Sequence, residues 1–106
     1  MVRKKKPRPE LSPDEQERLF HRGIELFNLG RYHDAHDEWE EIWRAIEGEE
    51  RDFYKGLIQA AVCLLHLERG NLRGTLKMSV GARKYLGLYL PSHRGLDLQK
   101  LKGEGP

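Results

Sequence analysis

The sequence has very little cysteine, and it lacks a long hydrophobic run. Its 106 residues include one cysteine, Cys63, so no disulfide can form within the chain, which fits a reducing cytoplasm. The longest apolar stretch, residues 53–67, contains three polar residues and is shorter than the roughly 20 residues of a membrane span. The basic N-terminus has no hydrophobic segment and is not expected to be a signal peptide. We therefore expect a cytoplasmic protein that does not cross a membrane.

Hydroxyl and thiol nucleophiles are also scarce. Thr75 is the only threonine, and there are three serines, of which Ser12 is expected to cap a helix. Cys63 lies in an apolar run and is expected to be a buried, inert thiol. No glycine-rich phosphate loop is present. These absences disfavour nucleophilic catalysis, and they leave open whether the protein is an enzyme at all.

Charged residues, in contrast, make up 34% of the chain and hydrophobic residues 38%, a balance typical of soluble globular domains. Arginine and glutamate dominate these charges, and asparagine and glutamine are rare, as in many thermophile proteins. Residues 34–52 hold nine acidic side chains against two arginines, whereas residues 69–102 hold eight basic side chains against one aspartate. Separate acidic and basic halves, together with the limited core of so short a domain, predict a homodimer or higher oligomer.

A single domain is expected over residues 11–102, between a basic N-terminal tail (1–10) and a C-terminal tail (103–106). The N-terminal tail carries five positive charges within residues 1–8 but no aromatic residue among them. Nucleic-acid binding by a flexible arm usually combines both. We therefore favour a solvated tail over a nucleic-acid arm.

The domain is predicted to be all-α, a compact antiparallel bundle of four main helices plus a short C-terminal helix, with no sheet. The string Ser12-Pro13-Asp14-Glu15 predicts a helix start with a capping box, and Gly30 predicts the end of that helix near Leu29. The second helix should end near Gly48 after a turn of a few residues.

The third predicted helix, residues 51–68, is apolar nearly all round and is expected to be the most buried. Asn71 is the predicted N-cap of the fourth helix, which should run to about Leu86. The short fifth helix is expected at residues 98–102, with Asp97 as its cap.

Two features of this pattern repeat or resemble a repeat. Gly30-Arg31-Tyr32 and Gly70-Asn71-Leu72 each join two predicted helices. The first helix pair also resembles a tetratricopeptide unit, with matching residues Gly23, Gly30, Tyr32, Ala35 and Trp39 and one departure, Ile42. At least three such units are needed for a solenoid, so a bundle is the favoured interpretation.

Residues 32–43 hold the side chains best suited to chemistry. His36 falls on the predicted buried stripe of the second helix, and Glu40 follows one turn later on the same side. On the third helix, a narrow polar stripe includes Gln59 and His66. Because buried polar atoms need partners, we expect His36 and Glu40 to meet His66 and Gln59 between the second and third helices.

This expected cluster has two interpretations. His36, Glu40 and His66 could hold a divalent metal, since two imidazoles and a carboxylate suit zinc, iron or manganese. Alternatively the cluster is structural, with His36 bonded to Glu40 or Gln59 and Glu40 paired to Arg44 along its own helix. His33 and Asp37 are expected to form only a surface pair.

Aromatic and basic residues provide two further candidate sites. Trp39 and Trp43 could stack a ligand, but at this spacing on an apolar face they are more often core residues. Arg73, Lys77 and Lys84 form a basic patch on the predicted fourth helix.

Three function classes follow: a protein-interaction module, a metal-dependent enzyme or metal-binding protein, and an anion or nucleic-acid binder that uses the basic patch and the N-terminal tail. We favour the first, because it needs no chemistry that the sequence fails to show, and we disfavour a nucleic-acid partner.

Several strings together resemble a known family. They read FNLGRY (27–32), AHDEWEEIW (35–43) and GLIQAA (56–61), followed by His66 and RGN (69–71). Their order and spacing, over roughly residues 14–100, are similar to those of a small bacterial and archaeal family catalogued as domain of unknown function 309. The usual His-Glu pair of that family stands here as His36-Asp37. The resemblance implies an all-helical bundle and no established activity.

Overall fold

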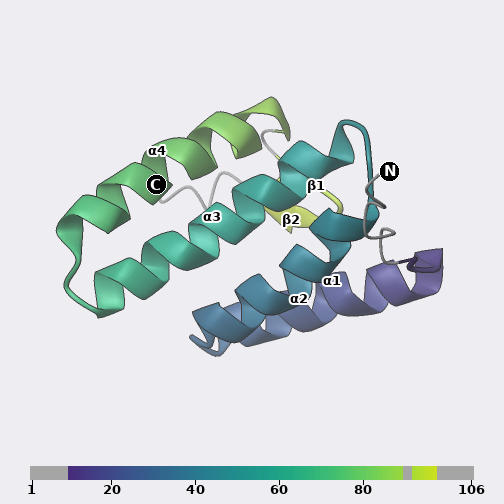
Figure 1. Cartoon of the computed structure of the whole chain (residues 1–106), viewed down its shortest axis with the longest axis horizontal. Coiled ribbons are helices and arrows are strands. Elements are labelled where there is room, and N and C mark those ends of the chain that lie inside the picture. Colours follow the sequence, from purple (N-terminus) through teal and green to yellow (C-terminus); the bar gives the residue numbers. More distant parts are fainter. Residues whose placement is uncertain (1–9, 90–91, 98–106) are drawn as a thin grey trace, which may run out of the picture.

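The computed structural model describes residues 10–89 and 92–97 of the chain (Figure 1). In chain order its elements are α1 (Pro13–Asn28), α2 (Tyr32–Ala45), α3 (Glu50–Glu68), α4 (Leu72–Leu86), the 3-10 helix η1 (Gly87–Tyr89), β1 (Ser92–His93) and β2 (Leu96–Asp97). The predicted four main helices are confirmed, whereas the short helix expected at residues 98–102 lies outside the described residues. No helix in the described ranges combines the length and hydropathy that a membrane span requires.

The first helix begins at the predicted capping box. The Ser12 hydroxyl accepts a hydrogen bond from the Glu15 backbone N–H at 3.2 Å, and the Glu15 carboxylate accepts one from the Ser12 backbone N–H at 3.3 Å. These hydrogen bonds hold the pKa of Glu15 below its ordinary value. Two helical N–H groups that would otherwise lack partners are thereby satisfied.

The turns after α1 and α3 share one geometry. Each contains a glycine with positive φ, 79° at Gly30 and 72° at Gly70, a conformation that a residue with a Cβ atom rarely adopts. In both turns the glycine N–H and the next N–H donate to carbonyls of the preceding helix, namely Phe27 and Leu26 in the first turn and Leu67 and His66 in the second. This is the Schellman arrangement, and it explains the repeated glycine in the sequence.

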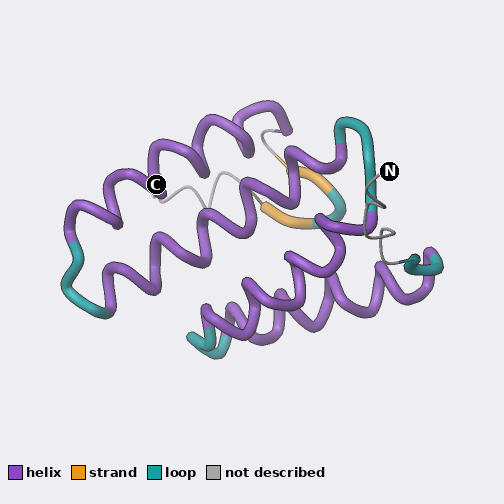
Figure 2. Tube along the Cα trace, viewed as in Figure 1, coloured by secondary structure: helices purple, strands orange, loops and turns teal. Residues whose placement is uncertain are grey.

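The helices pack as two successive hairpins, α1 with α2 and α3 with α4. In Figures 1 and 2, α3 lies between α2 and α4, and each helix packs chiefly against its neighbours in sequence. One side of α4 therefore rests on α3, while its other side has no helix against it in the described ranges.

The buried core forms where the two hairpins meet. It consists of residues from α1, α2, α3 and the end of α4: Phe20, Leu26, Ala35, Trp39, Ile42, Phe53, Tyr54, Leu57, Ala61 and Leu86. The helix α3 contributes more of them than any other element, as predicted. The C-terminal part of α3 is less covered than its apolar circumference suggests, because residues 62–66 are only half-buried and Leu67 is exposed. The α1–α2 hairpin covers chiefly the first half of α3.

The prediction of no sheet is also wrong, by one short hairpin. Strands β1 and β2 pair antiparallel, with His93 opposite Leu96, and appear in orange in Figure 2. The two residues between them, Arg94 and Gly95, have φ angles of 51° and 80°. Two positive φ angles in a two-residue loop are the mark of a type I′ turn, which fits the twist of an antiparallel pair.

Candidate functional site

Polar side chains run along one side of α2, and we call them the α2 ridge: His33, His36, Asp37, Glu40 and Arg44. Four-residue helical spacing pairs His33 with Asp37, His36 with Glu40, and Glu40 with Arg44. The His36 ring sits in the middle, with Nε2 at 3.0 Å from the Glu40 carboxylate and Nδ1 at 3.2 Å from that of Asp37. Glu40 is also paired with Arg44. Both ring nitrogens of His36 therefore face an acidic oxygen.

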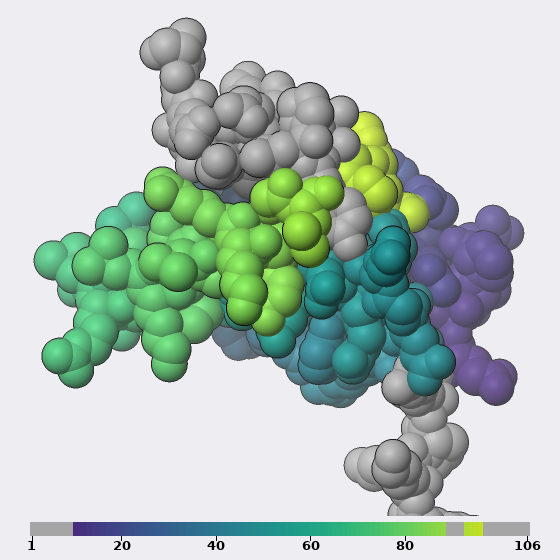
Figure 3. Space-filling view, turned by 90° about the horizontal axis from the view of Figure 1, so that it is seen from above, coloured from purple at the N-terminus to yellow at the C-terminus, as the bar shows by residue number. Residues whose placement is uncertain are grey.

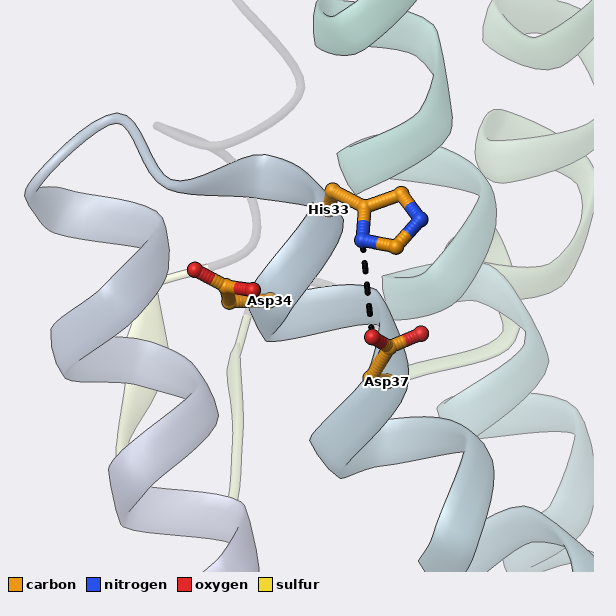
Figure 4. A group of neighbouring side chains, drawn as sticks. All are labelled: His33, Asp34 and Asp37. Carbon is orange, nitrogen blue, oxygen red and sulfur yellow. Dashed lines mark ion pairs between the residues drawn. The ribbon is translucent and has the colours of Figure 1, made fainter.

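The N-terminal part of the ridge gathers three potential ligand groups. His33, Asp34 and Asp37 each present one ligand atom within 4.8 Å of the others, and Figure 4 shows the His33 ring pointing toward Asp37. Nδ1 of His33 lies 3.4 Å from Asp37, as predicted for a surface pair. Asp34 is occupied by Arg31, at 2.6 Å. Of the three, His33 and Asp37 are therefore the pair best placed to accept a cation.

The expected burial of His36 and Glu40 is not found. Their side chains are 25% and 30% exposed, and no charged or polar residue in the described ranges is fully buried. The pairing of His36 with Glu40, and of Glu40 with Arg44, matches the structural interpretation of the cluster.

The predicted meeting of His36 and Glu40 with Gln59 and His66 is wrong. His66 accepts a hydrogen bond from the Asn71 side-chain amide at 3.2 Å, and its ring lies against Gly74 of α4. Gln59 lies against Gly81, where an added Cβ would fall 2.0 Å from the Gln59 Oε1 atom. The polar stripe of α3 therefore faces α4, not α2.

The reason lies in the small residues of α4. Gly74 and Gly81 have no side chains, so the longer polar side chains of α3 fit directly against the α4 backbone. Cys63, on the same stripe, donates to the Thr75 carbonyl oxygen at 3.4 Å. Burial raises the pKa of this thiol, so it stays protonated and keeps its donor at neutral pH. The thiol was expected to be fully buried but is only half-buried.

Both tryptophan side chains already contact other residues of the chain. Trp39 is enclosed in the core, donates from Nε1 to the Phe20 carbonyl oxygen at 3.2 Å, and packs against Gly23. The Arg51 guanidinium lies 4.0 Å from the ring centroid of Trp43. A ligand could stack on Trp39 only if the core opened, and on the Arg51 side of Trp43 only if the guanidinium moved.

The predicted basic patch is present on α4. Arg73, Lys77 and Lys84 are all exposed. The same helix carries Leu72, Leu76 and Val80, whose exposure the sequence did not predict.

Sequence reasoning missed a second polar cluster, which ties the β-hairpin to the helices. We call it the hairpin clasp: His93 and Arg94 of the hairpin with Glu17 of α1 and Glu50 of α3. Nε2 of His93 lies 2.9 Å from the Glu50 carboxylate, while Arg94 pairs with Glu17 and reaches Glu50 at 3.6 Å. Gly95 is a general turn signal that could have pointed to the hairpin, but no local pattern connects it with Glu17 or Glu50.

The clasp covers an aromatic group. The Arg94 guanidinium lies 4.8 Å from the Phe20 ring centroid, and the His93 ring lies edge-on to Phe53 at 4.5 Å. Tyr54 is buried beside them, and burial raises the pKa of its phenol to about 12. Its hydroxyl has no hydrogen-bond partner among the described residues. The clasp therefore seals one end of the core.

Comparison with known proteins identifies a family but no characterised relative. No curated protein and no solved structure matches the chain. A family model described as a domain of unknown function matches residues 20–78, which include α2, α3 and both shared turns. This match covers more than half of the chain and confirms the resemblance seen in the sequence strings. The protein belongs to the family named Domain of unknown function (DUF309).

Proposed function

We propose that the protein is a protein-interaction module that binds its partner through the outer face of α4. The observation that carries this proposal is a row of exposed aliphatic side chains, the α4 stripe: Leu72, Leu76 and Val80. They are 67%, 68% and 70% exposed. Four-residue spacing places them on one side of the helix over about 12 Å. Contiguous exposed apolar side chains mark interaction sites, whereas scattered ones are ordinary.

The inner side of α4 supports this proposal, because that side makes the contacts that hold α4 on the rest of the chain. Ala82 and Leu86 are buried, and Gly74 and Gly81 lie against side chains of α3. The stripe therefore contributes little to the core of its own chain. In Figure 3, α4 (in green) forms an outer part of the face in view.

Photo-crosslinking from the stripe tests the proposal. With a photoreactive phenylalanine analogue in place of Leu76, cells that make the protein should yield adducts of discrete higher mass after illumination. The same analogue in place of Glu41, an exposed residue on α2, is the matched control and should yield none. Equal labelling from both positions, or no adduct from position 76, would contradict the interaction function. An adduct of twice the chain mass would identify a second copy, and the homo-oligomer expected from the sequence stays a prediction until that measurement.

A second candidate function, divalent-cation binding, is favoured by the α2 ridge. At its N-terminal end, His33, Asp34 and Asp37 supply one imidazole and two carboxylates, whose ligand atoms lie within 4.8 Å of one another. Nitrogen and oxygen ligands of this kind suit zinc and similar metals. His66, which the sequence also suggested as a ligand, is engaged by Asn71 next to α4 and is left out of this set.

Zinc titration of the tag-free chain tests this second candidate. We expect one bound ion per chain, and His33→Ala should weaken the affinity by at least about tenfold because the imidazole ligand of the group is lost. The matched control is His21→Ala, which removes an exposed histidine that pairs with Glu17 at the same four-residue spacing. An equal loss in both variants would refute the site.

A further inference from the structure

The flanks of the α4 stripe carry charge of one sign. The segment from Leu72 to Leu86 contains no aspartate or glutamate. Arg73, Lys77 and Lys84 follow one another along one flank by helical spacing, and Arg83 lies in line with the row, three residues beyond Val80. All four side chains are exposed. A partner of this face therefore meets a narrow aliphatic row with positive charge along one flank and at its C-terminal end.

The shape and length of the row suit a helix. Side chains four residues apart form the ridges that pack between the ridges of another helix. Helical partners are recognised through such rows of spaced apolar anchors. The row covers only about two turns, so its apolar contact alone is small. Opposite charges along the edges would supply the orientation and the choice of partner.

A second copy of this chain fits the face poorly. Two α4 helices packed antiparallel would place each basic flank against the same flank of the other copy, and like charges repel. The acidic side of the chain offers complementary charge, but no large apolar side chain between residues 30 and 66 is exposed in the described ranges. A second copy could thus match either the charge or the apolar row of the stripe, but not both.

An anionic lipid surface fits less well than a helix. Helices that lie in a membrane interface usually insert aromatic and bulky side chains on a wide apolar face. The large apolar side chains exposed in the described part of this chain are leucines and one valine, with no aromatic among them. The apolar row on α4 is three residues long.

From this charge pattern we infer that the α4 stripe binds an amphipathic helix of another protein, with an aliphatic row flanked by aspartate and glutamate. The inference rests on the proposed interaction function and specifies the chemistry of its partner. Basic residues along α4 select the acidic flanks, and Leu72, Leu76 and Val80 bury the aliphatic row.

Three designed helical peptides of about 18 residues test the inference. They share one leucine row and differ only in their flanks, which are glutamate, glutamine or lysine. Titrated into the full chain, the glutamate peptide should bind at least about tenfold tighter than the glutamine peptide, and the lysine peptide should bind weakest. Between about 20 and about 500 mM salt this preference should shrink, because salt screens exposed charges.

Variants of the chain separate the two parts of the interaction. Leu76→Glu should abolish binding of all three peptides, whereas Leu29→Glu, at an equally exposed leucine in the turn between α1 and α2, should leave it unchanged. The double variant Arg73→Glu/Lys77→Glu should reverse the preference, so that the lysine peptide binds tighter than the glutamate peptide. Thermal unfolding at wild-type temperatures would show that each variant is folded.

Equal binding of the three peptides, or no binding of the glutamate peptide, would overturn the inference. Tighter binding of the chain to phosphatidylglycerol vesicles than to the glutamate peptide would also overturn it and would assign the face to a membrane. Self-association of the chain that is lost in Leu76→Glu would overturn it as well and would assign the face to a second copy. If no peptide binds but protein adducts form from position 76, the proposed interaction function stands and only the inference about the partner's chemistry is overturned. Absence of those adducts would remove the interaction function itself.

Discussion

Replacement of Phe53 by alanine is expected to lower the free energy of unfolding by about 3–5 kcal/mol. The Phe53 side chain has no exposed surface, and its ring lies 6.2 Å from that of Phe20, 5.3 Å from that of Tyr54 and 4.5 Å from that of His93. These neighbours come from α1, α3 and β1. The substitution therefore opens a cavity where three elements meet, and rigid rings on its walls cannot collapse to fill it.

Chemical denaturation of the two-state transition measures this loss directly. Leu88→Ala is the matched control, because Leu88 is 71% exposed and its replacement should change the free energy of unfolding by no more than about 0.5 kcal/mol. If both substitutions cost the same, the core does not lie where the structure places it.

Gly23→Ala is expected to destabilise the protein by about 3 kcal/mol although it adds only one methyl group. A Cβ atom at this position would lie 2.1 Å from Nε1 and 2.5 Å from Cε2 of Trp39, distances that no real contact tolerates. Trp39 is enclosed in the core and cannot swing into solvent. The methyl group would also displace the hydrogen bond from Trp39 to the Phe20 carbonyl oxygen.

Gly81→Ala provides the contrast, since it places the same methyl group against a different neighbour. Its closest contact would be the Oε1 atom of Gln59, the flexible end of a side chain. That oxygen has no hydrogen-bond partner among the described residues, so moving it breaks none of the observed bonds. Alanine also favours a helix over glycine by about 1 kcal/mol. Thermal unfolding should show Gly81→Ala at or slightly above the wild-type midpoint and Gly23→Ala well below it, and the opposite order would refute the packing described for Trp39.

Local signals in the sequence predicted the helices well, because each depends on a few adjacent residues. The Ser12 capping box and the glycines at positions 30 and 70 lie where they were expected. The burial of Trp39 followed from its place on the apolar stripe of α2. The pairs along α2 followed from four-residue spacing alone.

The candidate site was harder to predict, because a helical period shows which residues share a side but not which neighbour that side meets. Gln59 and His66 do share a side, yet that side faces α4. The glycines of α4 were visible in the sequence, but their effect depends on how closely two helices approach. The clasp was missed because it joins Arg94 to Glu17 across 77 positions of sequence.

The packing of each helix on its sequence neighbours has a consequence for the folding pathway. Folding rates rise as contacting residues lie closer in sequence, so this chain should fold rapidly, with α1 and α2 able to associate before α4 leaves the ribosome. The clasp depends on residues far apart in sequence, since His93 and Glu50 are separated by 43 positions. The entropic cost of closing the loop to the clasp is lowest once the packed helices already hold Glu17 and Glu50 near each other. Clasp formation should therefore be the last step, and weakening it should accelerate unfolding while leaving the refolding rate nearly unchanged.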